Sequence, residues 1–111
     1  MVLLREYLDE HGRSSFGRWL DDLAAPAALK VRTALARLEA GNTSALKSVG
    51  QGVHEVRIDF GPGYRVYLGV DGASLVILLG GSAKARQSRA ISDAQERWND
   101  YRRRKREAAG R

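Results

Sequence analysis

The spacing of hydrophobic residues changes from helical to alternating near the middle of the chain, and each spacing predicts a different kind of element. A short apolar run at 2–7 is typical of a strand, and a polar loop follows it. One helix, capped by Ser14 or Ser15, and a second, from Pro26 to a stop at Gly41-Asn42, come next. We expect these two helices to form an antiparallel hairpin.

Beyond a second polar loop, apolar and polar residues alternate, which is typical of half-buried strands. Strands are expected at 55–60 and 64–70, on either side of the turn Gly61-Pro62-Gly63. Asp71-Gly72 predicts another tight turn, and the apolar segment SLVILLGG at 74–81 is typical of a central strand. These three strands predict an antiparallel meander.

A last helix is expected from about residue 83 to 106, where the apolar residues return to helical spacing. The predicted order of elements is β-α-α-β-β-β-α within a single domain, 1–111. We therefore expect an α+β fold, in which a twisted antiparallel sheet has helices packed on one face and the other face partly open. Trp19 and Trp98 have apolar neighbours at helical spacing, which assigns them to the core.

The short turn 61–63 predicts a register for the two strands beside it, because residues directly opposite one another lie on the same face of a sheet. The predicted pairs are Phe60 with Tyr64, Asp59 with Arg65, and Arg57 with Tyr67.

This parity places five polar side chains on the face that we expect to be open: Glu55, Arg57, Asp59, Arg65 and Tyr67. Two arginines held on neighbouring strands would offer planar, permanently charged forks for a phosphate, and a tyrosine beside them could stack on a base. A second interpretation is the ordinary polar face of a sheet, with Asp59 and Arg65 in a surface ion pair of small energetic value. The alternation by itself is compatible with both.

Positive charge is concentrated at the C-terminal end of the chain. The formal net charge is +6; residues 1–83 contain nine Lys/Arg and nine Asp/Glu, whereas residues 84–111 contain ten and four. The basic helix end at 102–111 is therefore a candidate for binding a polyanion such as RNA, and the alternative is a solvated helix end. Its consecutive cations are Arg102, Arg103, Arg104, Lys105 and Arg106.

Another candidate anion site is the segment GGSAKARQ at 80–87, in which glycines lead into a helix. Lys84 and Arg86 would stand beside the free backbone amides of the first helical turn, where the helix dipole also attracts anions. The spacing differs from that of a nucleoside triphosphate loop, and an ordinary glycine turn is an equally simple interpretation.

Composition argues against metal and cofactor chemistry and against a membrane protein. The chain contains no cysteine and two histidines, His11 and His54, which cannot complete a zinc site without carboxylates. No apolar run has the length of a membrane helix or of a secretory signal, so we expect a cytoplasmic protein.

Five segments together resemble the RelE/ParE superfamily of type II toxins, in the HigB-like branch of addiction-module killer proteins. They are FGRWLDDL, VRTALARLEAGN, LKSVGQGVHEVRIDFGPGYRVYL, LLGGSAKARQ and AISDAQERW, and they extend from Phe16 to Trp98. Arg57 and Arg65 match family positions on neighbouring strands, and Lys84 matches a basic position after the last strand. The resemblance implies a RelE-like sheet with catalytic residues on its concave face.

The resemblance also implies a function. Such a toxin cuts messenger RNA, commonly on the ribosome, and is held inactive by an antitoxin, here a small helix-turn-helix protein. Cleavage by the ribose 2′-hydroxyl needs a base, cations and an acid but no metal. Glu55 or Lys84 would be the base, Arg57 and Arg65 the phosphate clamp, and Tyr67 a stacking group or acid.

The match to the family is incomplete at one position, and it leaves other functions open. Some relatives carry a histidine or tyrosine near the C-terminal end of the domain, where this chain has arginines. The alternatives are a toxin that binds and blocks a protein such as DNA gyrase, and a domain that has lost catalytic activity.

Overall fold

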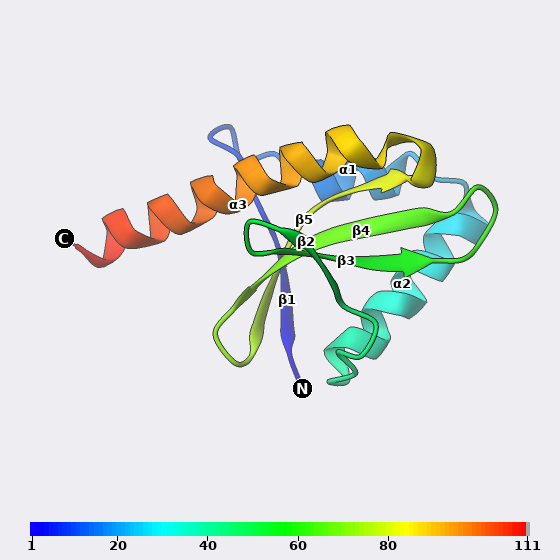
Figure 1. The fold of residues 1–111 in the computed structure, drawn as a ribbon, viewed down its shortest axis with the longest axis horizontal. Coiled ribbons are helices and arrows are strands. Elements are labelled where there is room, and N and C mark those ends of the chain that lie inside the picture. Colours follow the sequence, from blue (N-terminus) through cyan, green and yellow to red (C-terminus); the bar gives the residue numbers. More distant parts are fainter. Residues whose placement is uncertain (111) are drawn as a thin grey trace.

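The computed structural model describes residues 1–110, which form one five-stranded sheet and three α-helices (Figure 1). The fold is α+β, as predicted, and it contains one strand, β2, that the hydrophobic pattern did not predict. No helix in this part of the chain is both long and apolar enough to cross a membrane. The elements are β1 (Leu3–Glu6), α1 (Ser15–Asp21), α2 (Ala25–Glu39), β2 (Lys47–Gly50), β3 (Val53–Ile58), β4 (Tyr64–Asp71), β5 (Leu75–Ala83), the 3₁₀ helix η1 (Lys84–Arg86) and α3 (Gln87–Ala109).

The sheet is mixed, with the strand order β1-β5-β4-β3-β2. Strands β2 to β5 form the expected antiparallel meander, extended by β2. β1 runs parallel to β5, so the prediction of an entirely antiparallel sheet is wrong at this edge. β1 pairs only with residues 75–78, and β5 therefore continues beyond its neighbour.

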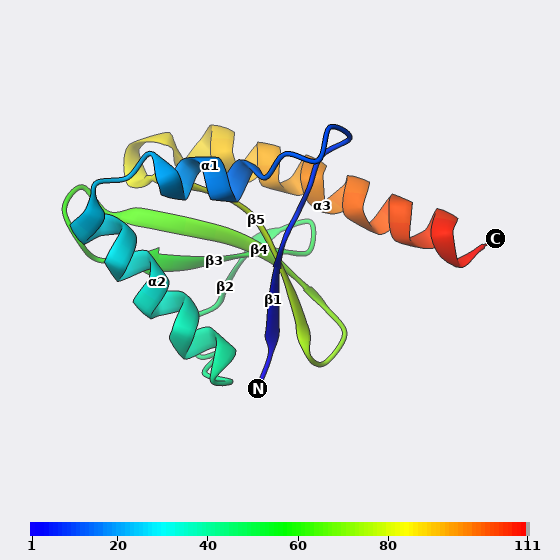
Figure 2. The ribbon, with the colours of Figure 1, turned by 180° about the vertical axis from the view of Figure 1, so that it is seen from behind.

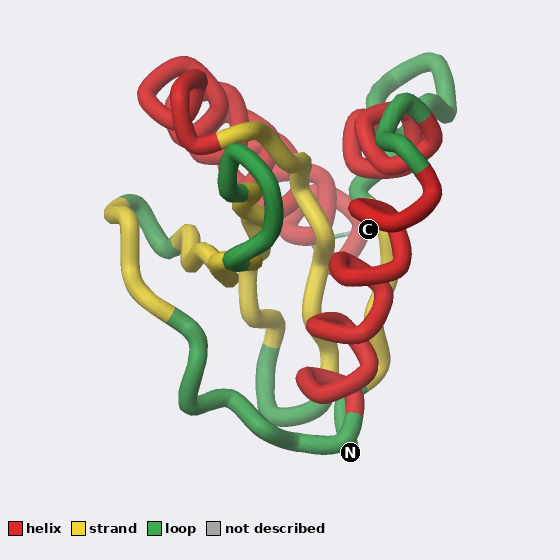
Figure 3. Tube along the Cα trace, turned by 90° about the vertical axis from the view of Figure 1, so that its right-hand side faces the viewer, coloured by secondary structure: helices red, strands yellow, loops and turns green. Residues whose placement is uncertain are grey.

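Helices lie on both faces of the sheet, which corrects the prediction that they cover only one (Figure 3). On one face, α1 and α2 contribute Phe16, Leu20 and Val31 to a core with the even-numbered residues of the strands. On the other face, α3 contributes Ala94 and Trp98 to a second core. The predicted helical hairpin is also wrong, because α1 runs along the top of the molecule in Figure 2 whereas α2 descends away from it.

Two glycines allow tryptophans to pack directly on the strands. A Cβ atom at Gly69 would overlap the Trp98 ring on the α3 side, and one at Gly81 would overlap the Trp19 ring on the α1 side. Trp98 is buried and Trp19 is half-buried against the first core, as their helical spacing predicted. These contacts fix the positions of α1 and α3 over the sheet.

The register between β3 and β4 differs from the prediction by two residues. Phe60 N donates to Ile58 O at 3.1 Å and Gly63 N donates to Phe60 O at 3.0 Å, so residues 59–63 form the turn. The pairs are consequently Ile58 with Tyr64, Arg57 with Arg65, and Glu55 with Tyr67. A shift of two residues keeps every side chain on its predicted face, because side chains alternate with period two.

Candidate functional site

Glu55, Arg57 and Arg65 meet on neighbouring positions of β3 and β4, and we call these three residues the Glu55 cluster. Arg57 Nε donates to Glu55 Oε2 at 2.7 Å, and Arg65 Nε lies 3.6 Å from the same oxygen. Arg57 and Arg65 stand directly opposite each other in the ladder. Contrary to the prediction, Arg65 is thus not paired with Asp59. Instead, the carboxylate of Glu55 forms ion pairs with both Arg57 and Arg65.

The Glu55 cluster is more buried than an open sheet face would allow. Glu55 is 3% exposed and Arg65 6% exposed, whereas the Arg57 side chain is 51% exposed. The first turn of α3 provides part of this cover, since Arg65 Nε donates to Gln87 Oε1 at 3.0 Å. The prediction of a helix-free face is therefore wrong around Arg65 and holds only near Arg57.

Both arginines of the cluster are held through their Nε atoms. The hydrogen bonds within residues 1–110 use Nε of Arg57 and Nε of Arg65, and none uses their terminal nitrogens. The terminal nitrogens of a guanidinium group match two oxygens of a phosphate or carboxylate. The half-exposed Arg57 thus offers an oriented donor pair to an anion, and Arg65 lies buried directly opposite it.

Tyr67 lies on the predicted face but is fully buried beneath α3. Its hydroxyl is 3.1 Å from Ser82 Oγ. Burial raises the pKa of Tyr67, and the negative charge of Glu55 raises it further. The structure therefore contradicts its predicted role as a base-stacking group, and it keeps the phenol protonated and away from solvent.

Lys84 stands at the same end of the sheet as the cluster. It follows β5 two residues after Ser82, the residue opposite Arg65. Its backbone amide donates to Gly63 O at 3.0 Å, and its side chain is exposed beside this turn. The structure thus brings Lys84 to the end of the face that carries Arg57 and Arg65.

Sequence reasoning missed Lys47, which lies in β2 directly opposite Glu55 and is exposed. Opposite residues share a face, so Lys47 adds a cation beside the Glu55 cluster. The sequence signal that could have found it is the turn Gly50-Gln51-Gly52, where all three residues have positive φ and return the chain onto β3.

Arg86, a second predicted anion ligand, points elsewhere. It lines a groove of about 760 Å³ between α1 and α3, together with Trp19, Leu23 and Ala90. Within residues 1–110 it makes no hydrogen bond or ion pair with the Glu55 cluster. The segment 80–87 therefore divides its two cations between separate surfaces.

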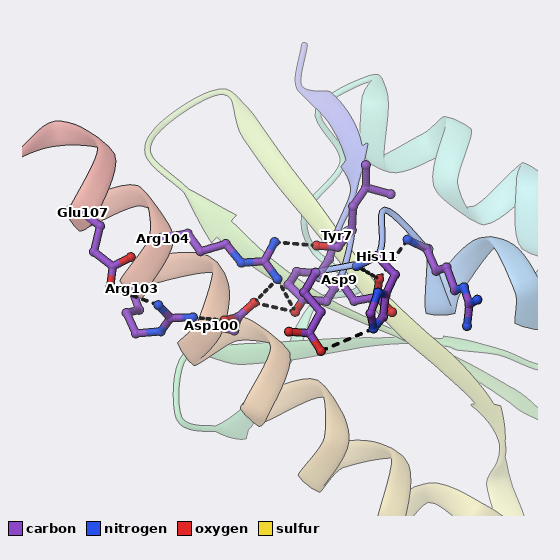
Figure 4. Close-up of polar contacts among 10 residues, drawn as sticks. Tyr7, Asp9, His11, Asp100, Arg103, Arg104 and Glu107 are labelled. Atoms are coloured by element: carbon purple, nitrogen blue, oxygen red, sulfur yellow. Dashed lines mark hydrogen bonds and ion pairs between the residues drawn. The ribbon is translucent and has the colours of Figure 1, made fainter. Parts of the chain in front are cut away.

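Part of the basic helix end is tied to the body of the protein (Figure 4). Arg104 donates to Leu8 O at 2.7 Å and pairs with Asp100 at 2.5 Å. Arg103 pairs with Asp100 and with Glu107, and Lys105 pairs with Asp71 of β4 at 2.6 Å. These three predicted RNA ligands have intramolecular partners; those of Arg104 and Lys105 anchor α3 to the rest of the protein, whereas those of Arg103 lie within α3.

The remaining two cations of the helix end, Arg102 and Arg106, are exposed. They line a second hollow of about 510 Å³ beside Trp98, Tyr101 and His54. His54 Nδ1 is buried and has no hydrogen-bond partner among the described residues. Arg102 and Arg106 are thus the cations of this segment most available to a polyanion.

Within residues 1–110, no three His, Asp or Glu side chains are arranged to hold a metal ion. The side chains that the structure brings together here are two oriented guanidinium groups, two exposed lysines and a buried carboxylate. Such a set binds anions and stabilises developing negative charge.

An uncharacterized protein of Haemophilus influenzae is 43% identical to this chain over 82 residues, which cover 73% of this chain and 83% of that protein. No family model matches the chain. The chain belongs to the same family as this Haemophilus protein.

Proposed function

We propose that this chain is the toxin of a type II toxin-antitoxin system and cuts messenger RNA on the ribosome. The observation that carries the proposal is the pair Arg57 and Arg65, opposite each other on β3 and β4 and each held through Nε. The terminal nitrogens of Arg57, which is half-exposed, would bind the phosphate on which the neighbouring 2′-hydroxyl acts, and the buried Arg65 would add its positive charge behind them. The RelE/ParE-like segments of the sequence point to the same chemistry.

The geometry distributes the roles differently from the sequence expectation. Glu55 is buried and engaged by both arginines, so we assign it to positioning them and not to proton abstraction. Arg57 and Arg65 would stabilise the additional negative charge of the phosphorane. Lys84 is an exposed group at this end of the sheet and would carry the proton of the attacking 2′-hydroxyl to the departing 5′ oxygen; Tyr67 takes no direct part.

The ribosome and an antitoxin are the partners of this proposal. The site has few groups with which to orient RNA by itself, and orientation by a large partner removes much of a reaction barrier. Arg102 and Arg106 would add contacts to the RNA backbone. The antitoxin would be a small helix-turn-helix protein, and the toxin would act in the cytoplasm, where messages are translated.

A second candidate function is supported by a specific observation. The carboxylate at the site is neutralised by two arginines and the phenol is buried, so exposed lysines are left as the groups that could transfer a proton. A surface of this kind also suits a toxin that binds and blocks an acidic protein target, such as DNA gyrase, without cutting RNA.

Induction of the protein alone in bacteria separates the two functions. The nuclease proposal predicts growth arrest with new 5′ ends in translated messages, mapped by primer extension, and no cleavage of an untranslated message. Arg57→Ala should greatly reduce the cuts, whereas the matched variant Arg32→Ala, on the exposed side of α2, should retain them. Arrest with intact messages and gyrase-dependent DNA breaks would support the second function and exclude the first.

A further inference from the structure

The upper edge of the sheet in Figure 3 has an unpaired stretch of strand between two helices. β1 covers β5 only over residues 75–78, and within residues 1–110 no strand pairs with that side of 80–83. An open strand edge presents a row of backbone donors and acceptors that can pair with another chain. This edge lies at the floor of the 760 Å³ groove between α1 and α3.

The direction of the free backbone groups follows from the ladder. Lys84 N donates to Gly63 O at 3.0 Å, which points this amide toward β4. Backbone groups of an antiparallel strand alternate between its two sides, so those of Ser82 also face β4 and those of Gly81 and Ala83 face the groove. The bulge residue Leu79 has its carbonyl occupied by Arg97 at 3.1 Å, and the free edge begins after it.

The two walls of the groove differ in chemistry. The wall on the α1 side is apolar and includes Trp19 of α1 and Leu23, which follows this helix. The opposite wall carries Arg86 of η1, together with Arg89 and Asp93 of α3, which pair with each other at 3.2 Å. Arg86 forms no ion pair among the described residues, so this wall has one unmatched positive charge in a chain whose formal net charge is +6.

We propose that residues 80–83 bind an extended acidic segment of another protein as an added strand in this groove. Side chains of an added strand alternate between the two walls. One row would be apolar against Trp19 and Leu23, and the other row would be acidic toward Arg86. This surface is separate from the Glu55 cluster, so the inference does not depend on the proposed nuclease function.

The direct probe is a fluorescein-labelled heptapeptide that alternates glutamate and valine, capped at both ends, measured by fluorescence polarisation. We expect saturable binding, and we expect slower amide hydrogen exchange at Gly81 and Ala83 when the peptide is present. A peptide that alternates lysine and valine has the same apolar row and should bind at least about tenfold more weakly, because it repels Arg86. Equal binding of the two peptides would overturn the acidic specificity.

The backbone pairing has its own test in Ala83→Pro. Ala83 has φ of −73° and an extended ψ, which proline adopts without strain, so the fold and its thermal unfolding should be retained. Loss of the outward N–H and the bulk of the ring should weaken peptide binding about tenfold. Methylation of alternate peptide nitrogens should have the same effect on the unchanged protein, which tests the pairing without any substitution. Binding unchanged by both modifications would refute strand addition.

Two further outcomes decide the nature of the occupant. Arg86→Glu should weaken binding of the glutamate–valine peptide. Arg32→Glu, a charge reversal on the exposed side of α2, should leave the affinity for this peptide unchanged. An equal effect of the two reversals would show that only net charge matters and would contradict a built site. Concentration-dependent dimerisation in analytical ultracentrifugation that Ala83→Pro abolishes would assign the edge to a second copy of this chain and overturn the proposed partner.

Discussion

Replacement of Glu55 by glutamine tests whether the buried carboxylate organises the two arginines. Glutamine keeps the shape of the side chain and one oxygen that can accept from Arg57 Nε, but it removes the negative charge beside Arg65. The Arg65 side chain is only 8% exposed, so water compensates little for this loss. Removal of one partner of a fully buried ion pair costs about 3–5 kcal/mol.

The retained hydrogen bond and the 51% exposure of Arg57 reduce this cost, and we expect a loss of about 2–3 kcal/mol in the free energy of unfolding. For a chain of 111 residues, 1 kcal/mol corresponds to a change in Tm of about 4 °C. Glu55→Gln should therefore lower Tm by about 8–12 °C.

Differential scanning calorimetry of the wild type, Glu55→Gln and the matched control Glu96→Gln measures this effect. Glu96 is an exposed glutamate of α3 that has no partner within the described residues, so its neutralisation should leave Tm nearly unchanged. If Glu55→Gln melts within about 2 °C of the control, the carboxylate is not a structural counter-charge for Arg65, and the assigned positioning role is wrong.

Three other predictions concern the contacts of α3. Burial, reinforced by hydrogen bonds to aspartates, raises the pKa of Tyr7 and of Tyr101 to about 12. The protonated phenols therefore stabilise the folded state fully below about pH 10, and this stabilisation is lost between about pH 10 and 12. Tm measured across this range should fall less steeply in Tyr101→Phe than in the wild type. Arg104→Ala should destabilise the fold by about 1–3 kcal/mol in urea unfolding, whereas Arg106→Ala should leave stability unchanged and reduce the salt dependence of RNA binding. Gly69→Ala should cost about 1–3 kcal/mol, because its Cβ would overlap the ring of the buried tryptophan on α3; unfolding midpoints of the variant and wild type give this difference.

The sequence predicted the type of most elements because their apolar spacing is set by local geometry. The period-two pattern also placed Arg57, Arg65, Glu55 and Tyr67 on one face, since parity survives a change of register. The pairing itself depended on where the turn begins. Hydrogen bonds around Phe60 lengthen that turn by two residues, and no alternation of apolar residues reports them.

The environment of the candidate site could not be predicted in the same way. Helical spacing shows that α3 has a buried face, but the side of the sheet on which it packs depends on long-range fits such as Trp98 against Gly69. Because α3 packs on the face that carries the charged residues, Tyr67 belongs to the core and Arg65 forms a buried ion pair with Glu55. Charge counting likewise identified the basic helix end but not the partners of Arg104 within the chain.

Single-turnover cleavage of a message on programmed ribosomes tests the central claim most directly. Arg57 is half-exposed, so Arg57→Ala should retain the fold and nearly the same Tm. If its terminal nitrogens bind the reacting phosphate, Arg57→Ala should slow cleavage by about 10²- to 10³-fold, and Arg57→Lys should restore only part of the rate, because an ammonium group lacks the two-pronged geometry. A folded Arg57→Ala protein that cuts at the wild-type rate, or a wild-type protein that leaves the message intact, would contradict the account.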